Sequence, residues 1–342
     1  MNSACKRFAP RLAWLALIIL LALSFIASVT FGSVDLPIAE VLRALVGQQL
    51  DGYGSAIVQA IRLPRSLLAA AVGAILAISG AYLQGLFRNP LADPSLIGVT
   101  AGASVGASLA IVFGAAGLGF ISSLSLVSLG AFGGGLLAVW LVYKVSSSVN
   151  GTSVATMLLM GIAVSALAAS LTGLMDYFAD NEMLRRLSLW RMGGLDGANY
   201  GRAGLAIAVL SLMLLSMGGF SRGLNTLLLG ESQARHLGVD VERLKTQLII
   251  LVAAGVGVSV AMAGSIAFVG LVVPHMVRLW VGPDHRLLLP LSALGGASLL
   301  LLADTFARVV VAPTELPVGL VTAILGAPFF ISLLRNRRDI LR

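Results

Sequence analysis

Charged residues divide the chain into long stretches of apolar side chains. The first uncharged stretch runs from Leu12 to Val34, and the second occupies 66–87, between Arg65 and Arg88. A helix needs about 20 apolar residues to cross a hydrocarbon layer of ~30 Å. A basic start before an apolar stretch also resembles a signal peptide, but 12–34 is longer than a typical cleavable region, so it predicts the first span.

The next stretch, 94–143, holds 50 uncharged residues. As one helix it would be ~75 Å long at ~1.5 Å per residue, far beyond one crossing. We therefore expect a break between Gly114 and Gly119 and a very short turn there. This stretch then yields two helices, at about 95–113 and 121–143. A fifth span is predicted within 152–175 and a sixth within 203–221.

The stretch 246–277 decides the number of spans. Its 32 residues make either one long tilted helix or two short helices divided near Gly264 and Ser265. The last two spans are expected at 287–306 and 316–334, so the chain has nine or ten helices. Only ten helices place both basic ends of the chain on the same side, as the positive-inside rule asks of cytoplasmic segments. The chain is therefore predicted to be an all-α polytopic membrane protein with ten helices and both termini in the cytoplasm.

This topology also distributes the remaining basic residues unequally. Of the 23 Lys and Arg residues, 15 fall on the cytoplasmic side and 8 on the exterior side. The excess supports the orientation. The exterior set consists of Arg43, Arg62, Arg65, Arg185, Arg186, Arg191, Arg202 and Arg308.

Composition agrees with a membrane protein and excludes other classes. The chain is 58% hydrophobic and only 11% charged, against about 25% charged in soluble domains. The net charge is +8, and the Lys and Arg residues that produce it are scattered between apolar stretches. This pattern indicates membrane topology rather than nucleic-acid binding. The single cysteine, Cys5, excludes an intrachain disulfide. The 39 glycines, many of them inside spans, predict closely packed helices.

The spans carry no recognisable catalytic or energy-coupling residues. No Gly-Lys pair occurs, so a Walker A motif is absent and any ATP must be used by another chain. The three histidines, His236, His275 and His285, lack metal-ligand spacing and are interpreted as structural or surface residues, so we expect no metal site. Only Asp304 approaches a span interior, which disfavours a proton-coupled carrier. A self-sufficient channel or secondary carrier remains the alternative class.

The longest interior loop, 221–247, contains LLLGESQARHLGVDVERLK between two apolar helices. Gly230 and Gly238 are the expected breaks around a short charged helix. The loop is either a solvated connector or a docking helix for a cytoplasmic partner.

Five segments together resemble one protein family. The chain is similar to the permeases of type II ABC importers that serve iron-siderophores, haem and cobalamin (the FecCD-like permeases). The resemblance covers about 62–334 in family order. The segments are RLPRSLLAAAVGAILAISGAYLQGLFRNPLADPSLIGVTAGAS at 62–104, GESQARHLGV at 230–239, IAFVGLVVPHMVRLWVGPDHR at 266–286, LADTFAR at 302–308 and ELPVGLVTAILGAPFF at 315–330.

The resemblance implies a single transmembrane permease domain over 1–342, with ten helices, in the cell inner membrane. It implies a homodimer whose translocation path follows the two-fold axis. Two cytoplasmic ATPase subunits would bind ATP and Mg, and a periplasmic binding protein would deliver the substrate. This chain itself would be a transport subunit rather than an enzyme and would hold no cofactor.

The resemblance also implies roles for individual residues. The coupling helix that inserts into the ATPase would include Gly230, Glu231, Ala234, Leu237 and Gly238. Docking arginines for carboxylates of the binding protein would be Arg62, Arg65 and Arg308, which could instead anchor helix ends at lipid headgroups. A cytoplasmic gate is expected at Asn89 and Leu91, in a turn stiffened by Pro90 and Pro94. Its second part, near Thr152 to Thr156, cannot be aligned.

The exterior segment 181–197, NEMLRRLSLWRMGGLDG, resembles the corresponding part of haem permeases more than that of cobalamin permeases. Arg185, Arg186 and Arg191 could attract haem propionates or an anionic siderophore. The segment could also be an interfacial helix anchored by Trp190. Haem is the predicted substrate, with a ferric siderophore or cobalamin as alternatives.

Overall fold

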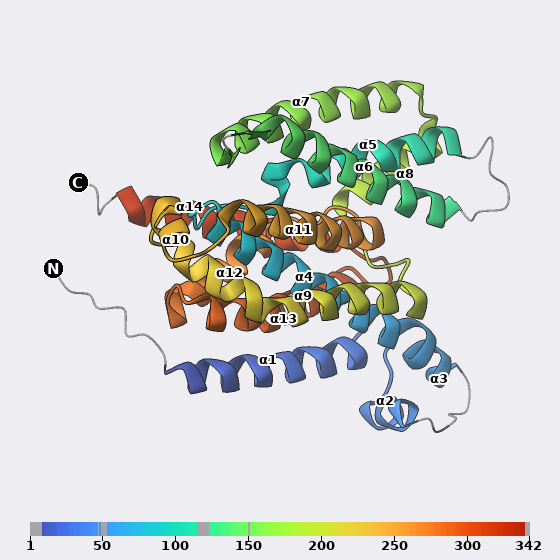
Figure 1. The fold of residues 1–342 in the computed structure, drawn as a ribbon. Helices are drawn as coiled ribbons and strands as arrows, with labels where there is room; N and C mark the ends of the chain where they lie inside the picture. The colour runs from blue at the N-terminus through green and yellow to red at the C-terminus, as the bar shows by residue number, and fades with distance from the viewer. Residues whose placement is uncertain (1–8, 47, 49–52, 115–122, 150, 339–342) are drawn as a thin grey trace.

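The computed structural model describes residues 9–338 except 47, 49–52, 115–122 and 150, and describes no side chains beyond residue 332. The expected break between Gly114 and Gly119 lies mostly outside the described residues, as does Cys5. In the described part, helices dominate (Figure 1). The elements are α1 (Pro10–Thr30), α2 (Ile38–Leu45), α3 (Gly54–Ala56), η1 (Ile57–Arg62), α4 (Leu63–Leu86), η2 (Pro94–Ile97), α5 (Val99–Phe113), α6 (Ser123–Ser146), β1 (Ser147–Ser148), β2 (Gly151–Thr152), α7 (Val154–Phe178), α8 (Asn181–Met192), α9 (Tyr200–Leu227), α10 (Glu231–His236), α11 (Val241–Ala263), α12 (Val269–Val281), α13 (His285–Val309) and α14 (Val318–Arg338).

The predicted ten spans match these elements. Among the described residues, seven helices are long and apolar enough to cross a membrane, and α5, α12 and α14 add three shorter apolar helices. The ambiguous stretch 246–277 is divided, because α11 ends before Gly264, which has a φ of +66°, and α12 begins after Phe268, which has a φ of +68°. Two short helices were therefore the right prediction for this stretch.

Burial separates central helices from peripheral ones. In the most apolar part of α4, 89% of the residues are buried, against 17% for α9 and 22% for α7. A helix that is apolar all round must be covered on every face, and α13, α9, α12 and α11 pack around α4. The apolar side chains of the peripheral helices face outward, where a bilayer or another subunit can cover them.

Paired glycines bring the central helices into backbone contact. Gly73 of α4 faces Gly296 of α13, and a Cβ on either glycine would overlap the carbonyl oxygen of the other. A Cβ on Gly80 would also overlap the carbonyl oxygen of Gly270 on α12. Small residues at such crossings allow helices to approach closely in lipid. The glycine-rich spans therefore form the interfaces that the composition predicts.

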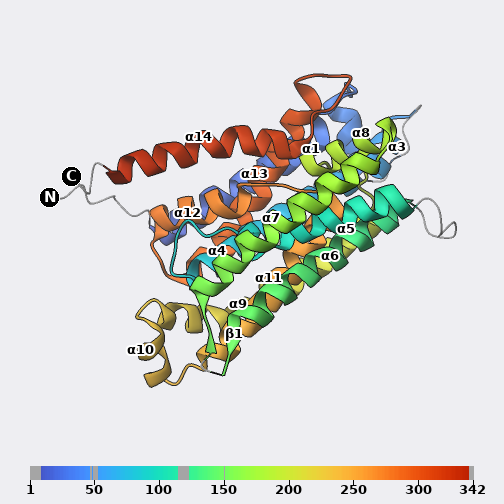
Figure 2. The same cartoon turned by 90° about the horizontal axis from the view of Figure 1, so that it is seen from above.

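The bundle has two chemically distinct ends. At one end, called here the α10 end, lie the start of α1, the end of α14, α10 and the β1–β2 hairpin (Figures 1 and 2). The hairpin is antiparallel and pairs Ser147 with Thr152. At the opposite end, called the α8 end, lie α2, α3 and α8. Both ends carry residues that the sequence singled out.

Candidate coupling segment and charged ends of the bundle

The loop that was predicted to dock a partner does contain a short helix, α10. Gly230 has a φ of +111° and Gly238 a φ of +82°, so both glycines adopt backbone conformations that other residues rarely take. Glu231 lies in the first turn and Arg235 in the last, which suits the helix dipole. The expected breaks of this helix are confirmed.

Most of α10 faces away from the bundle. Ala234 is the buried residue of α10, and Leu237, which follows the last residue of the helix, is 64% exposed. An exposed leucine next to charged residues can bind a partner surface through apolar contact, while Ala234 seats the helix on the bundle. The Glu231 side chain is half-buried, because its carboxylate points back to the bundle.

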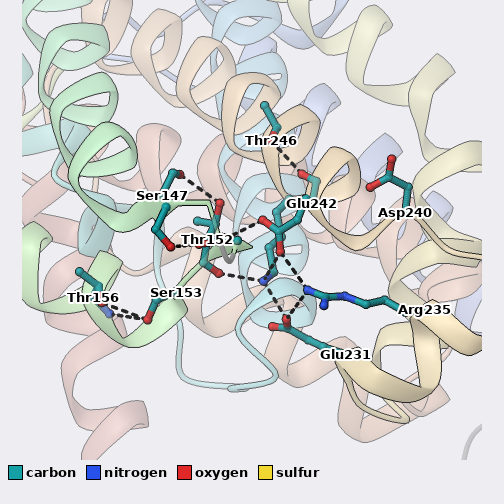
Figure 3. A network of polar contacts seen from close by, with 12 residues as sticks. Ser147, Thr152, Ser153, Thr156, Glu231, Arg235, Asp240, Glu242 and Thr246 are labelled. Atoms are coloured by element: carbon teal, nitrogen blue, oxygen red, sulfur yellow. Dashed lines mark hydrogen bonds and ion pairs between the residues drawn. The ribbon is translucent and has the colours of Figure 1, made fainter.

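A buried lysine on α11 donates a hydrogen bond to that carboxylate. Figure 3 shows Glu231 together with Glu242 and Thr152, which belong to the same network. The Lys245 side chain is 2% exposed. Its ammonium group donates to Glu231 Oε2 at 2.9 Å, to the Thr152 carbonyl oxygen at 2.9 Å and to Glu242 Oε1 at 3.2 Å. The second oxygen of Glu242 accepts the Thr152 N–H at 2.7 Å. The network joins α10, α11 and the β1–β2 hairpin.

The predicted gate turn lies at the same end. Arg88, which has a φ of +50°, is within reach of Gly230, because a Cβ on Gly230 would lie 3.8 Å from the Arg88 guanidinium. The Asn89 side chain accepts the Leu91 N–H at 3.0 Å and closes the turn locally. Asn89 is exposed and Leu91 half-buried. The structure thus brings the turn near the coupling segment, and the gating role of Asn89 and Leu91 stays a prediction.

The three predicted docking arginines are buried at the α8 end. Arg62 is 3% exposed, Arg65 7% and Arg308 3%. Arg65 binds Asp304 at 2.9 Å and Glu315 at 2.6 Å. Arg308 binds the second oxygen of Asp304 at 3.0 Å. One fully buried carboxylate is therefore shared by two guanidinium groups, and Glu315 supplies the second negative charge.

Backbone oxygens of the first span complete this cluster. Arg62 donates to the carbonyl oxygens of Val29, Thr30 and Val34, where α1 ends. Arg308 donates to the Ser28 carbonyl at 2.8 Å. Helix C-termini leave carbonyl groups without helical partners, and the arginines bind them. In this structure the three side chains hold α1, α4 and α13 together, and their role in docking stays a prediction.

The arginines predicted to attract substrate differ in their surroundings. Arg191 is bound to Asp176 of α7 through two hydrogen bonds of 2.8 and 2.7 Å. Arg186 pairs with Glu182 one turn earlier, with both side chains exposed. Arg185 is exposed on α8. Arg185 and Arg186 therefore remain accessible to an anion, whereas Arg191 joins α8 to α7.

Two of the three histidines lie inside the fold. His285 is fully buried, and its Nδ1 and backbone N–H both lie 2.8 Å from the Asn225 side-chain oxygen. The Asn225 amide donates to Asp284 at 2.6 Å. Burial by itself raises the pKa of the Asp284 carboxyl, but hydrogen bonds from the Arg286 N–H and from Asn225 outweigh it and lower that pKa. These contacts connect the end of α9 to the start of α13.

The other two histidines differ in burial, since His236 is exposed and His275 is buried. No cluster of metal-ligating side chains occurs among the residues that the structure describes.

Sequence reasoning missed the partners of these charges. It did not single out Lys245, Glu242, Asp176 or Glu315. Glu242 and Lys245 stand three residues apart at the start of a helix, which is the spacing of an ion pair and was available as a signal. The other pairs join residues far apart in the chain, so the sequence alone gave no signal for them.

Comparison with known proteins agrees with this architecture. Residues 20–336 match the FecCD transport family. The chain is 42% identical over 337 residues to the hemin transport system permease protein HmuU of Yersinia pestis, covering 97% of this chain and 98% of the relative. It is 46% identical over 285 residues to the cobalamin import system permease protein BtuC of Halobacterium salinarum, covering 82% and 74% of the two chains.

A solved structure shares the whole fold. A chain described as an inward-facing conformation of a metal-chelate type ABC transporter superposes with a TM-score of 0.83 at 34% identity, and the match covers 96% of this chain and 100% of that one. Family and structure agree over nearly the entire length of the chain, so the match to a permease fold is not confined to one part of it. This protein belongs to the FecCD transport family and is a permease subunit of an ABC importer.

Proposed function

We propose that this permease carries haem across the membrane into the cytoplasm. The observation that carries the proposal is the 42% identity to a hemin permease over 97% of this chain and 98% of that relative. The exposed Arg185 and Arg186 at the α8 end fit the proposal, since guanidinium groups bind carboxylates such as the propionates of haem.

The transporter we propose contains two copies of this chain, two ATPase subunits and a binding protein. Exposed apolar side chains along α7, such as Leu159 and Ile162, and along α14, such as Ile324, give a second copy a surface to cover. The exposed face of α10 with Leu237 suits an ATPase groove. ATP and Mg would be bound by those ATPase subunits, because no Walker A motif occurs in this sequence.

The α10 end would face the cytoplasm and the α8 end the exterior. The start of α1 and the end of α14 lie at the α10 end, and the basic tails follow from there. The positive-inside rule favours this orientation in the cell inner membrane. The gate at Asn89 and Leu91 would then close the inner end of the path, next to the ATPases.

Cobalamin is the second candidate substrate, because the matched part of a cobalamin permease is 46% identical to this chain. A ferric siderophore is the third, since it is also a large metal chelate. Permeases of one fold differ in the side chains that line the path, so the fold does not choose among these substrates.

The test is ATP-dependent uptake into proteoliposomes that hold this permease, its ATPase and its binding protein. Haem, cobalamin and a ferric siderophore are offered in parallel, and each component is omitted in turn. We expect haem uptake that needs ATP and all three proteins. Uptake of another substrate alone would replace haem, whereas ATP-independent uptake would contradict the importer assignment.

A further inference from the structure

Lys245 is hydrogen-bonded to the coupling helix, to the hairpin and to the start of a span. Its three hydrogen-bond acceptors belong to three different elements: Glu231 to α10, Thr152 to β2 and Glu242 to α11. An ammonium group has three donors and no acceptor, so these bonds use it completely. A second cation, Arg235, lies 3.4 Å from Glu242 and 4.0 Å from Glu231.

The hairpin is held through its backbone rather than through side chains that could rotate away. The Thr152 carbonyl accepts from Lys245 and the Thr152 N–H donates to Glu242. Gly151, with a φ of +109°, lets the hairpin approach this closely, since a Cβ there would lie 2.8 Å from a Glu242 oxygen. Both backbone polar groups of Thr152 are thus bound by side chains of α11.

The position of Thr152 also sets the start of α7. Ser153 follows directly and caps α7 by accepting the Thr156 N–H at 3.3 Å. A displacement of Thr152 therefore moves the first turn of a span that is mostly exposed along its length. On the other side of the network, α10 is anchored to the bundle by the buried Ala234 and by the hydrogen bond that Glu231 accepts from Lys245.

We propose that Lys245 is a positioning residue that ties the coupling helix α10 to the first turn of α7, so that movement of α10 is transmitted to the inner end of this span. The proposal rests on the proposed function, because it assigns α10 to contact with the ATPase. The proposal adds Lys245, which the sequence analysis did not single out. This buried residue would link the contact between α10 and the ATPase to the region of the inner gate.

The first experiment measures the tie in this chain alone, in lipid vesicles. Spin labels are placed at two exposed positions, Gln233→Cys on α10 and Val149→Cys at the hairpin, in a Cys5→Ser background. The labelled chain is diluted with an excess of unlabelled chain, so that pulsed electron paramagnetic resonance gives the distance distribution between the two labels of one copy. We expect one narrow distribution in the parent, a clearly broader one in Lys245→Met, and a narrow one in the control Arg243→Met, which removes an exposed cation from the same helix.

The second experiment uses the complete transporter with ATPase and binding protein. Lys245→Met should lower the number of substrate molecules imported per ATP hydrolysed by about tenfold, while assembly and thermal stability stay close to those of Arg243→Met. Loss of a merely structural contact would lower stability and assembly without changing that ratio. Lys245→Arg, which keeps the charge, should restore part of the coupling.

The two experiments separate this proposal from the proposed function. If the parent transporter imports no haem, the substrate assignment fails, and the spin-label distances still report whether Lys245 ties α10 to the hairpin. If Lys245→Met keeps both the narrow distribution and full coupling, the tie is wrong. A broadened distribution with unchanged coupling also overturns the proposal, since the link would then transmit nothing.

Discussion

At the scale of single residues, Asp304 determines the charge balance of the α8 end. It is fully buried and forms ion pairs with both Arg65 and Arg308. Asp304→Asn would leave two buried guanidinium groups without their shared countercharge, and removing one partner of a buried pair costs about 3–5 kcal/mol. We expect a lower thermal unfolding temperature in detergent.

The matched control for that change is Glu315→Gln. Glu315 binds the same Arg65 at 2.6 Å, but its side chain is 32% exposed. Solvent compensates such a loss, so the expected cost is about 1 kcal/mol or less. Equal losses in the two variants would show that the buried cluster is not the source of stability.

The same residues allow a test of the docking prediction. Arg62, Arg65 and Arg308 are occupied by partners within the chain, so a carboxylate of a binding protein must replace one of these contacts. If these arginines dock the binding protein, Glu315→Gln frees N–H donors of Arg65 for its carboxylate and should not lower the affinity for the binding protein. Arg65→Gln should lower that affinity. Unchanged affinity for the binding protein in stable Arg65→Gln would assign the arginines to structure alone.

At the scale of elements, α10 is the surface on which coupling depends. Leu237→Lys places a charge where an exposed leucine is expected to enter an apolar groove of the ATPase. Loss of a central contact costs about 2 kcal/mol, or roughly thirtyfold in affinity. We expect the ATPase to bind that much more weakly, measured by titration of the permease in nanodiscs.

A control for Leu237→Lys is Ser188→Lys, at an exposed position of α8 at the opposite end. Both variants should insert into the membrane and keep their unfolding temperature, because neither side chain is buried. If Leu237→Lys binds the ATPase as the parent does, the coupling surface lies elsewhere.

The crossing of α4 and α13 supports a second prediction at this scale. In Gly73→Ala the new methyl group would collide with the backbone of Gly296. Overpacking costs about 1–3 kcal/mol when neighbours can shift, and backbone at a helix crossing shifts least. We expect less folded protein and a lower unfolding temperature.

Gly204→Ala is the comparison for Gly73→Ala. Gly204 also lies inside a helix, but a Cβ there meets nothing within 4 Å. Alanine favours helix by about 1 kcal/mol over glycine, so this variant should be as stable as the parent or more stable. A loss in Gly204→Ala equal to that in Gly73→Ala would rule out close packing as the cause.

At the scale of the whole molecule, orientation in the membrane follows from the two ends. Single cysteines at Gln233 and Ser188, in a Cys5→Ser background, are exposed at the α10 end and the α8 end. A membrane-impermeant maleimide added to intact cells with a permeable outer membrane should label Ser188→Cys and leave Gln233→Cys until the inner membrane is opened. The reverse pattern would invert the proposed topology.

The sequence by itself determined the ten spans and the ends of α10. The spans follow from charge spacing, because the thickness of the hydrocarbon layer sets the length of every uncharged stretch. The ends of α10 follow from Gly230 and Gly238, because their positive φ angles are a local property of the chain. Motif order was also enough to identify the permease family.

The tertiary structure decided the partners of most of these charges, because sequence spacing indicates only pairs within one helix, such as Glu242 with Lys245 and Asp304 with Arg308. Arg65 lies 239 residues from Asp304 in sequence, and Lys245 lies 93 from Thr152. Three arginines that the sequence placed at an exterior surface are buried, because helix packing brings a carboxylate and free helix carbonyls to them. Hydropathy predicts which segments lie in lipid, but it does not predict the partner of a buried charge. That partner depends on which helices cross. Close backbone contacts, such as that between Gly73 and Gly296, determine the crossings.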